Sequence, residues 1–138
     1  MAIPKCSNQG WADFWKEDRL GSCAPENKDP AEEIHRRWIE LLSDLPQGSR
    51  VLDIATGNGI LLTHAEAAAK RSGKRYTLTG VDLAPIDPFR YVSDLSEGLH
   101  KAKFIGGIPA ENLPFDEDAF DVILSQYGLE YADLGRAL

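Results

Sequence analysis

Two glycines and one acid carry the clearest chemical signal in this sequence. Gly57 and Gly59 directly follow the apolar run of residues 51–55, and a helix-like segment begins after them. Glycine lets the backbone take positive φ angles, and the start of a helix presents free N–H groups to a ligand. Asp82 ends a second apolar run about 20 to 25 residues later, where an acid in nucleotide-binding folds accepts hydrogen bonds from ribose hydroxyls. The pattern predicts a site for a ribose-containing ligand.

Other ligands of glycine-rich turns fit the spacing less well. A P-loop requires Gly-Lys-Ser/Thr, which is absent here, and a dinucleotide turn that starts at Gly57 requires a small residue where Leu62 stands. In the alternative register, Ala55 replaces the first glycine. The sequence therefore favours a nucleoside-type ligand without a strong phosphate requirement. Asp82 either binds the ribose or only caps the turn that follows it.

The elements around this turn predict an α/β fold. Residues 50–55 form an expected strand whose run 51–55 does not alternate polar with apolar residues, as for a parallel strand covered on both faces. A second expected strand, residues 76–81, is β-branched and also stops at an acid, and a helix over about 58–72 separates the two. A short helix is expected over 89–97, a weak third strand over 103–105 and a fourth strand over 120–125. We therefore predict a Rossmann-like, open, mainly parallel sheet flanked by helices and truncated after strand 4.

An N-terminal helical segment, residues 1–48, is expected to pack on the partial cofactor-binding domain of residues 49–138. Its main helix should begin at Asp29 as N-cap, with Pro30 and Glu32 in the first turn, and end before Pro46. Upstream, an aromatic cluster with helical spacing either docks onto the domain or covers a ligand site as a lid; it consists of Trp11, Phe14 and Trp15.

Composition excludes several classes of partner. The net charge of −7 argues against a surface built for nucleic acid. A short basic group suits the C-terminus of the helix over 58–72; its members are Lys70, Arg71, Lys74 and Arg75. No run is long enough to cross a membrane and no signal peptide is evident, so we expect a cytoplasmic protein. Cys6 and Cys23 form no metal or redox motif with each other or with the three histidines, so no metal site is expected.

Four segments resemble, in order, the motifs of class I S-adenosylmethionine-dependent methyltransferases. Residues 51–59, VLDIATGNG, are similar to the first motif, and residues 80–83, GVDL, to the acid motif after the second strand. Residues 110–115, AENLPF, and 120–125, FDVILS, are similar to the third and fourth. The resemblance covers residues 51–131 and implies S-adenosyl-L-methionine as cofactor and methyl transfer as activity.

The resemblance also implies roles for individual residues. The glycines would let the backbone approach the methionine part of the cofactor, Asp53 would hold the loop in shape, and Asp82 would bind the ribose. Leu83 would pack on adenine, and residues 125–126 would line the path to the methyl group. The implied cofactor-binding residues are Asp53, Ala55, Gly57, Asn58, Gly59, Asp82, Leu83, Ala110, Glu111, Ser125 and Gln126.

The chain departs from the family pattern at three points. Ala55 stands where many members have glycine, and Pro109 stands where many have an aspartate that contributes to adenine recognition. Members normally continue for three more strands in the order 3-2-1-4-5-7-6, which leaves the fourth strand of this chain at an edge. Because a bare apolar edge invites pairing, we expect either a shortened chain or a homodimer formed across the strand-4 edge.

Methyl transfer from a sulfonium depends mainly on alignment, so a catalytic base is not required and no catalytic residue is assigned. His64 is expected at the surface, whereas Tyr127 and Tyr131 are either core aromatics or lie near the reaction site. The acceptor is expected to be a small molecule. Two other functions remain open: a non-catalytic S-adenosylmethionine-binding module or inactive fragment, and a Rossmann-type oxidoreductase, which Leu62 disfavours.

Overall fold

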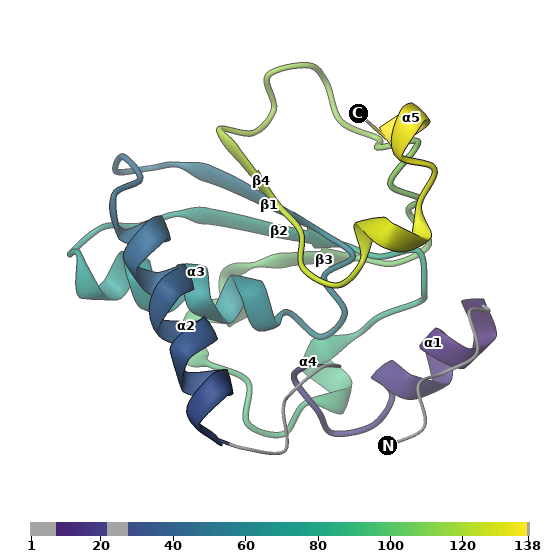
Figure 1. Ribbon diagram of the computed structural model, residues 1–138, viewed down its shortest axis with the longest axis horizontal. Coiled ribbons are helices and arrows are strands. Elements are labelled where there is room, and N and C mark those ends of the chain that lie inside the picture. The colour runs from purple at the N-terminus through teal and green to yellow at the C-terminus, as the bar shows by residue number, and fades with distance from the viewer. Residues whose placement is uncertain (1–7, 22–27, 138) are drawn as a thin grey trace.

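The computed structural model describes residues 8–21 and 28–137 and shows a four-stranded parallel sheet with helices against one face (Figure 1). The strands are β1 (Arg50–Ile54), β2 (Thr77–Val81), β3 (Lys103–Ile105) and β4 (Val122–Leu124), in the order β3-β2-β1-β4. β1 pairs with β2 over its whole length and with β4 through residues 51–53. The predicted Rossmann-like fold is confirmed, and β4 forms one outer edge of the described sheet.

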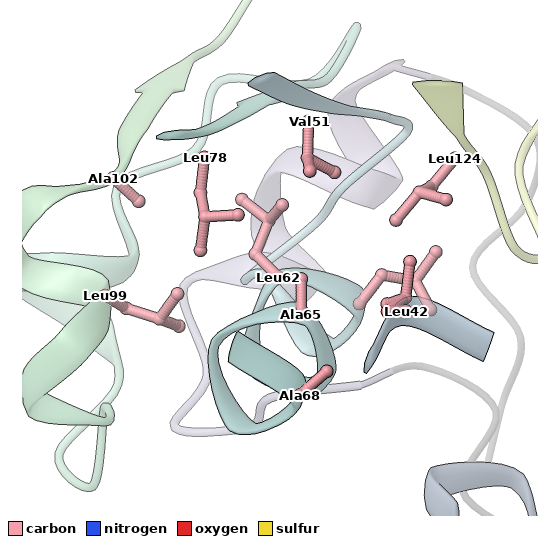
Figure 2. Packing of buried hydrophobic residues seen from close by; sticks show 10 residues of the cluster. Leu42, Val51, Leu62, Ala65, Ala68, Leu78, Leu99, Ala102 and Leu124 are labelled. Carbon is pink, nitrogen blue, oxygen red and sulfur yellow. The ribbon is translucent and has the colours of Figure 1, made fainter. Parts of the chain in front are cut away.

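Two long helices cover one face of the sheet. They are α2 (Lys28–Ser43) and α3 (Ile60–Arg71), which pack against each other and bury Leu42, Leu62 and Ala65 over Val51 and Leu78 (Figure 2). The alanines of α3 permit this close approach because they add little side-chain volume. Helix α2 begins at Lys28, one residue before the predicted cap, and the Asp29 side chain that would form that cap lies outside the described part.

Loops rather than long helices cover the opposite face. Leu52, Ile54 and Val81 are buried there beneath apolar side chains of the connection between β3 and β4 and of the segment after β4. The covering side chains are Ile108, Ala110, Leu113, Phe115, Phe120 and Leu129, and Ile105 of β3 packs in the same cluster. Both faces of β1 are therefore buried, as the absence of polar–apolar alternation in its sequence predicts.

The region between β2 and β3 differs from the expected single helix. The structure has two short helices instead, α4 (Pro88–Tyr91) and the 3₁₀ helix η1 (Glu97–Lys101). The predicted extent of the helix, residues 89–97, is wrong, because α4 ends at Tyr91 and Glu97 begins η1. The 3₁₀ helix η1 places Leu99 in the core against α3, where its side chain is fully buried.

The two ends of the described chain form smaller elements. Helix α1 (Asn8–Trp15) lies apart from α2 and α3 in Figure 1, on the side where the strands end. After β4 come η2 (Leu129–Tyr131) and α5 (Leu134–Ala137). Within residues 8–21 and 28–137, no helix is long and apolar enough to span a membrane.

Candidate functional site

The turn between β1 and α3 is built from unusual backbone conformations. Ala55, Gly57 and Gly59 all have positive φ angles, of 60°, 55° and 93°. The Thr56 N–H donates to the Val81 carbonyl at 3.0 Å, which ties the turn to the last residue of β2. The turn therefore lies where the carboxyl ends of β1 and β2 meet, the edge at which open α/β sheets bind ligands.

Asp82 joins this turn to the loop after β2. Its Oδ2 accepts a hydrogen bond from the Gly57 N–H at 2.8 Å, and its Oδ1 accepts one from the Ala84 N–H at 2.9 Å. Burial raises the pKa of Asp82, whereas these two hydrogen bonds lower it. The structure thus brings Gly57 and Asp82 together as the sequence pattern predicts. Each carboxylate oxygen can accept a further hydrogen bond, so binding of a ribose by Asp82 remains a prediction.

A second acid lies within β1. Asp53 is only 1% exposed, and burial raises its pKa to about 8. The nearby Thr56 hydroxyl lowers this pKa, and the charge of Asp82 raises it. Three buried oxygens have no hydrogen-bond partner among the described residues: Asp53 Oδ1, Thr56 Oγ1 and Asn58 Oδ1. Such atoms are uncommon in folded proteins, and here all three belong to β1 and the turn that follows it.

The two glycines of the turn are in contact with aromatic side chains of the chain itself. A Cβ on Gly57 would lie 2.4 Å from two ring carbons of Trp15, and a Cβ on Gly59 would lie 2.8 Å from the ring of Phe104. Any side chain at either position would therefore collide with a ring. Asn58, between them, is fully buried and donates through Nδ2 to the carbonyls of Trp15 and Arg19, at 3.1 and 2.7 Å.

The residues expected near adenine lie on the far side of Asp82. The Ile108 N–H donates to the Asp82 carbonyl at 2.9 Å, which brings the start of the 108–111 segment beside the end of β2. Leu83 is 53% exposed, whereas Ala110 packs onto the loop-covered face. Glu111 accepts a hydrogen bond from the Asp133 N–H at 2.8 Å, which lowers the pKa of Glu111.

The segment after β4 forms the other side of the site. Ser125 Oγ donates to the Ile54 carbonyl at 2.9 Å, and Gln126 Oε1 accepts from Trp38 Nε1 at 2.9 Å. Tyr127 follows with a φ of 60° and is about half exposed. Sequence reasoning did not identify Trp38 as the partner of Gln126, since nothing in the pattern of α2 indicates a contact with a residue so distant in the chain. The side chain of Tyr131 lies outside the described part.

The prediction that His64 lies at the surface is wrong. His64 is 5% exposed, and its Nδ1 lies 2.6 Å from Nδ1 of His35, because α2 packs across this face of α3. Burial and the neighbouring His35 lower the pKa of His64 to about 4. His64 is therefore a neutral packing residue near pH 7.

The described ranges contain no group of three or more metal-ligating side chains. Cys6 and Cys23, which we expected to be incidental thiols, lie outside those ranges. The candidate site thus consists of the turn after β1, the acid at the end of β2, the 108–111 segment and the segment after β4.

The fold and this pairing of a glycine turn with an acid define a Rossmann-like α/β protein. The chain belongs to a methyltransferase family, because a family model described as a methyltransferase domain matches residues 27–133. A curated relative, the ubiquinone/menaquinone biosynthesis C-methyltransferase UbiE of Methylococcus capsulatus, is 35% identical over 101 residues. That alignment covers 70% of this chain but 39% of the relative, so the chain spans about two fifths of its length.

Solved structures show the same fold. A proposed S-adenosyl-L-methionine-dependent methyltransferase of Methanococcus maripaludis matches with a TM-score of 0.58 and 14% identity, covering 99% of this chain and 58% of that one. A chain of the complex between the Haloferax volcanii Trm112 methyltransferase activator and a proposed methyltransferase matches with a TM-score of 0.54 and 20% identity, covering 96% and 51%. The described sheet corresponds to about half of these larger proteins.

Proposed function

We propose that this chain binds S-adenosyl-L-methionine at the carboxyl ends of β1 and β2 and contributes this site to a methyltransferase. The observation that carries the proposal is the hydrogen bond of 2.8 Å between the Gly57 N–H and Asp82. It joins the two motifs that family resemblance assigns to the cofactor. Family membership supports the reaction class.

The residues present fit such a cofactor. Asp82 has remaining capacity to accept hydrogen bonds from ribose hydroxyls. The exposed side chain of Leu83 offers an apolar surface to adenine, and the unpartnered Asn58 Oδ1 can accept a hydrogen bond near the turn. When bound, S-adenosyl-L-methionine would supply a methyl group on a positively charged sulfur; the acceptor's nucleophile would bond to the methyl carbon in line, and S-adenosylhomocysteine would leave with the electron pair of the broken carbon–sulfur bond. The other implied cofactor contacts are proposed for Asp53, Ala55, Gly59, Ala110, Glu111, Ser125 and Gln126.

The proposed acceptor is a small molecule, as the relative's role in ubiquinone and menaquinone biosynthesis suggests. It would approach from the segment after β4, where Tyr127 is exposed. Alignment of the two reactants can supply most of the acceleration in such a displacement. We therefore assign positioning to this segment and no proton transfer to any residue.

Calorimetry with three ligands tests the proposal. S-adenosyl-L-methionine and S-adenosylhomocysteine should both bind, and NAD should not, because Leu62 occupies the position that a dinucleotide turn keeps small. Binding of NAD without a response to the other two would refute the proposal. Asp82→Ala should weaken binding, and it should also lower stability because Asp82 holds two backbone N–H groups.

A non-catalytic cofactor-binding module is the second candidate. Such a module would require only the turn after β1 and Asp82, which the hydrogen bond from the Gly57 N–H joins. The two candidates differ in turnover. Binding of S-adenosylhomocysteine without methyl transfer to any tested acceptor would favour the module.

We also propose that β4 pairs with β4 of a second copy. Among the described strands, β4 has a neighbour on one side only, and Ile123 is 59% exposed. Unpaired apolar edges are prone to such pairing. Sedimentation should show a dimer, and a monodisperse monomer that binds no hydrophobic dye would exclude this arrangement.

A further inference from the structure

Trp15 occupies the space that the proposed cofactor needs. Gly57 lacks a side chain, yet its open side is filled by the Trp15 indole, whose ring carbons lie 2.4 Å from where a Cβ would be. The N–H of Gly57 already donates a hydrogen bond to Asp82. A ligand could therefore approach the Gly57 backbone closely only if the indole moved.

The contacts that hold α1 are separate from the main core. Phe14, Trp15 and Ala84 form their own small apolar cluster, distinct from the two clusters that pack against the sheet. Helix α1 can therefore leave the turn without opening the core beneath β1. Figure 1 agrees with this separation, since α1 lies away from α2 and α3.

Polar contacts hold α1 and the residues that follow it, 16–21, at two points; together they are called the α1 segment. The Asn58 amide donates to the carbonyls of Trp15 and Arg19, and Asp18 accepts hydrogen bonds from the N–H and hydroxyl of Ser93. Asn58 belongs to the glycine turn itself, so release of α1 also frees its N–H groups to donate to a ligand. The Asn58 Oδ1 has no hydrogen-bond partner among the described residues, which makes this fastening incomplete.

We propose that α1 covers the cofactor site in the ligand-free chain. The Trp15 indole occupies the side of Gly57 that the cofactor would approach, and the Asn58 amide holds α1 in place through the Trp15 and Arg19 carbonyls. This inference rests on the proposed function. The closed form reduces the apparent affinity by the fraction of molecules that are open, as for any ligand that binds a minor conformation. Binding of the cofactor displaces α1 and shifts the population toward the open form.

The first test is the dissociation constant of S-adenosylhomocysteine, measured by calorimetry on the full chain. Trp15→Ala should bind S-adenosylhomocysteine at least about tenfold more tightly than the wild type. This gain is expected because an open state that makes up about 10% or less of the wild-type molecules would become the dominant state in the variant. Asp18→Asn, which weakens the distant fastening at Ser93, should bind about two- to fivefold more tightly by the same relation. Glu17→Gln is the matched control and should leave the affinity unchanged, because the Glu17 ion pair is to Arg19 in the same segment.

The second test is trypsin cleavage after Lys16 and Arg19, which immediately follow α1. S-adenosylhomocysteine should accelerate cleavage of the wild-type chain there. The contrary result is a Trp15→Ala variant that folds, as shown by circular dichroism, and yet binds S-adenosylhomocysteine no more tightly than the wild type. That result would contradict the proposal and would mean that Trp15 lines the site instead of blocking it. Protection from trypsin would overturn the proposal equally. If wild type and all variants fail to bind either S-adenosyl compound, the proposed function fails and the competition with it.

Discussion

The two turns that flank the candidate site are built in opposite ways. In the turn after β1, residues 56–59 are all buried, and they are held by Asp82, by Val81 and through Asn58 by the α1 segment. In the segment after β4, Ser125 and Gln126 are each fixed by one side-chain hydrogen bond, and Tyr127 is about half exposed. The first turn has a fixed shape, whereas the second presents a large polar aromatic residue to solvent.

This difference matches the two tasks of a methyltransferase. A cofactor that is the same in every member can be bound by a fixed turn of small residues, whose sequence is correspondingly recognisable. An acceptor that differs between enzymes is contacted by exposed side chains, which can change without loss of the fold. The turn after β1 therefore supports a specific ligand proposal, and the segment after β4 supports only a general class of acceptor.

The largest expected effect tests whether packing fixes the turn after β1. Gly59→Ala combines a φ of 93° with a contact at 2.8 Å to Phe104, so it should lower the free energy of unfolding by about 2–4 kcal/mol. Gly73→Ala, at the other end of α3, has a φ of 67° with open space around it and should cost only about 1 kcal/mol. Urea denaturation measures both.

Equal losses in the two alanine variants would contradict this account. They would mean that backbone conformation alone requires glycine at position 59. The contact with Phe104 would then be easily relieved, and the turn after β1 would be no more tightly packed than an exposed helix end.

A smaller effect tests whether the two turns support each other. Gly128 has an ordinary φ of −137°, but a Cβ there would lie 2.2 Å from the Cβ of Ala55. Gly128→Ala should therefore lower stability by about 1–3 kcal/mol through overpacking alone. Ala55→Gly removes that Cβ and the strain of a φ of 60°, so the double variant should recover most of the loss.

A double-mutant cycle by urea denaturation separates the possibilities. A coupling energy near zero between positions 55 and 128 would show that the two turns are independent, because residues in contact normally couple by about 0.5 kcal/mol or more. The cycle also bears on the sequence. Ala55 stands at a position where the methyltransferase pattern usually has glycine, and its positive φ gives a physical reason for that preference.

Local patterns made the sheet and the turn after β1 predictable. Apolar runs gave the four strands, and parallel strands that end at the same edge brought Gly57 and Asp82 together. The contacts that pattern reasoning missed join segments far apart in the chain, such as Trp38 with Gln126. Likewise, the burial of His64 results from the packing of α2 across α3. The local sequence of α3 does not reveal this packing, so His64 was wrongly expected at the surface.

The smallest expected effect concerns Asp53, the buried acid of β1 next to the turn. The described segment after β4 has no comparable buried acid. The pKa of Asp53 is about 8 in the folded chain against an ordinary value of 3.8, so the folded state binds more protons than the unfolded state. The resulting stability is complete below pH 3.8 and is lost as the pH rises through 8. Between pH 7 and 8, the free energy of unfolding should fall by about 1 kcal/mol.

Urea denaturation at pH 7.0, 7.5 and 8.0 on the wild type and Asp53→Asn measures this slope, and the pH values are chosen from the Asp53 pKa of about 8. The variant should lose most of this slope, because the carboxyl group that titrates near pH 8 is absent from it. His64, with a lowered pKa of about 4, acts in the opposite direction at lower pH and is neutral in this range. Asp121→Asn is the control, since the pKa of Asp121 is about 2 and its ionisation is complete throughout. Equal slopes in wild type and Asp53→Asn would show that Asp53 is already charged at pH 7, and that the turn after β1 rests on an anion rather than on a neutral carboxyl group.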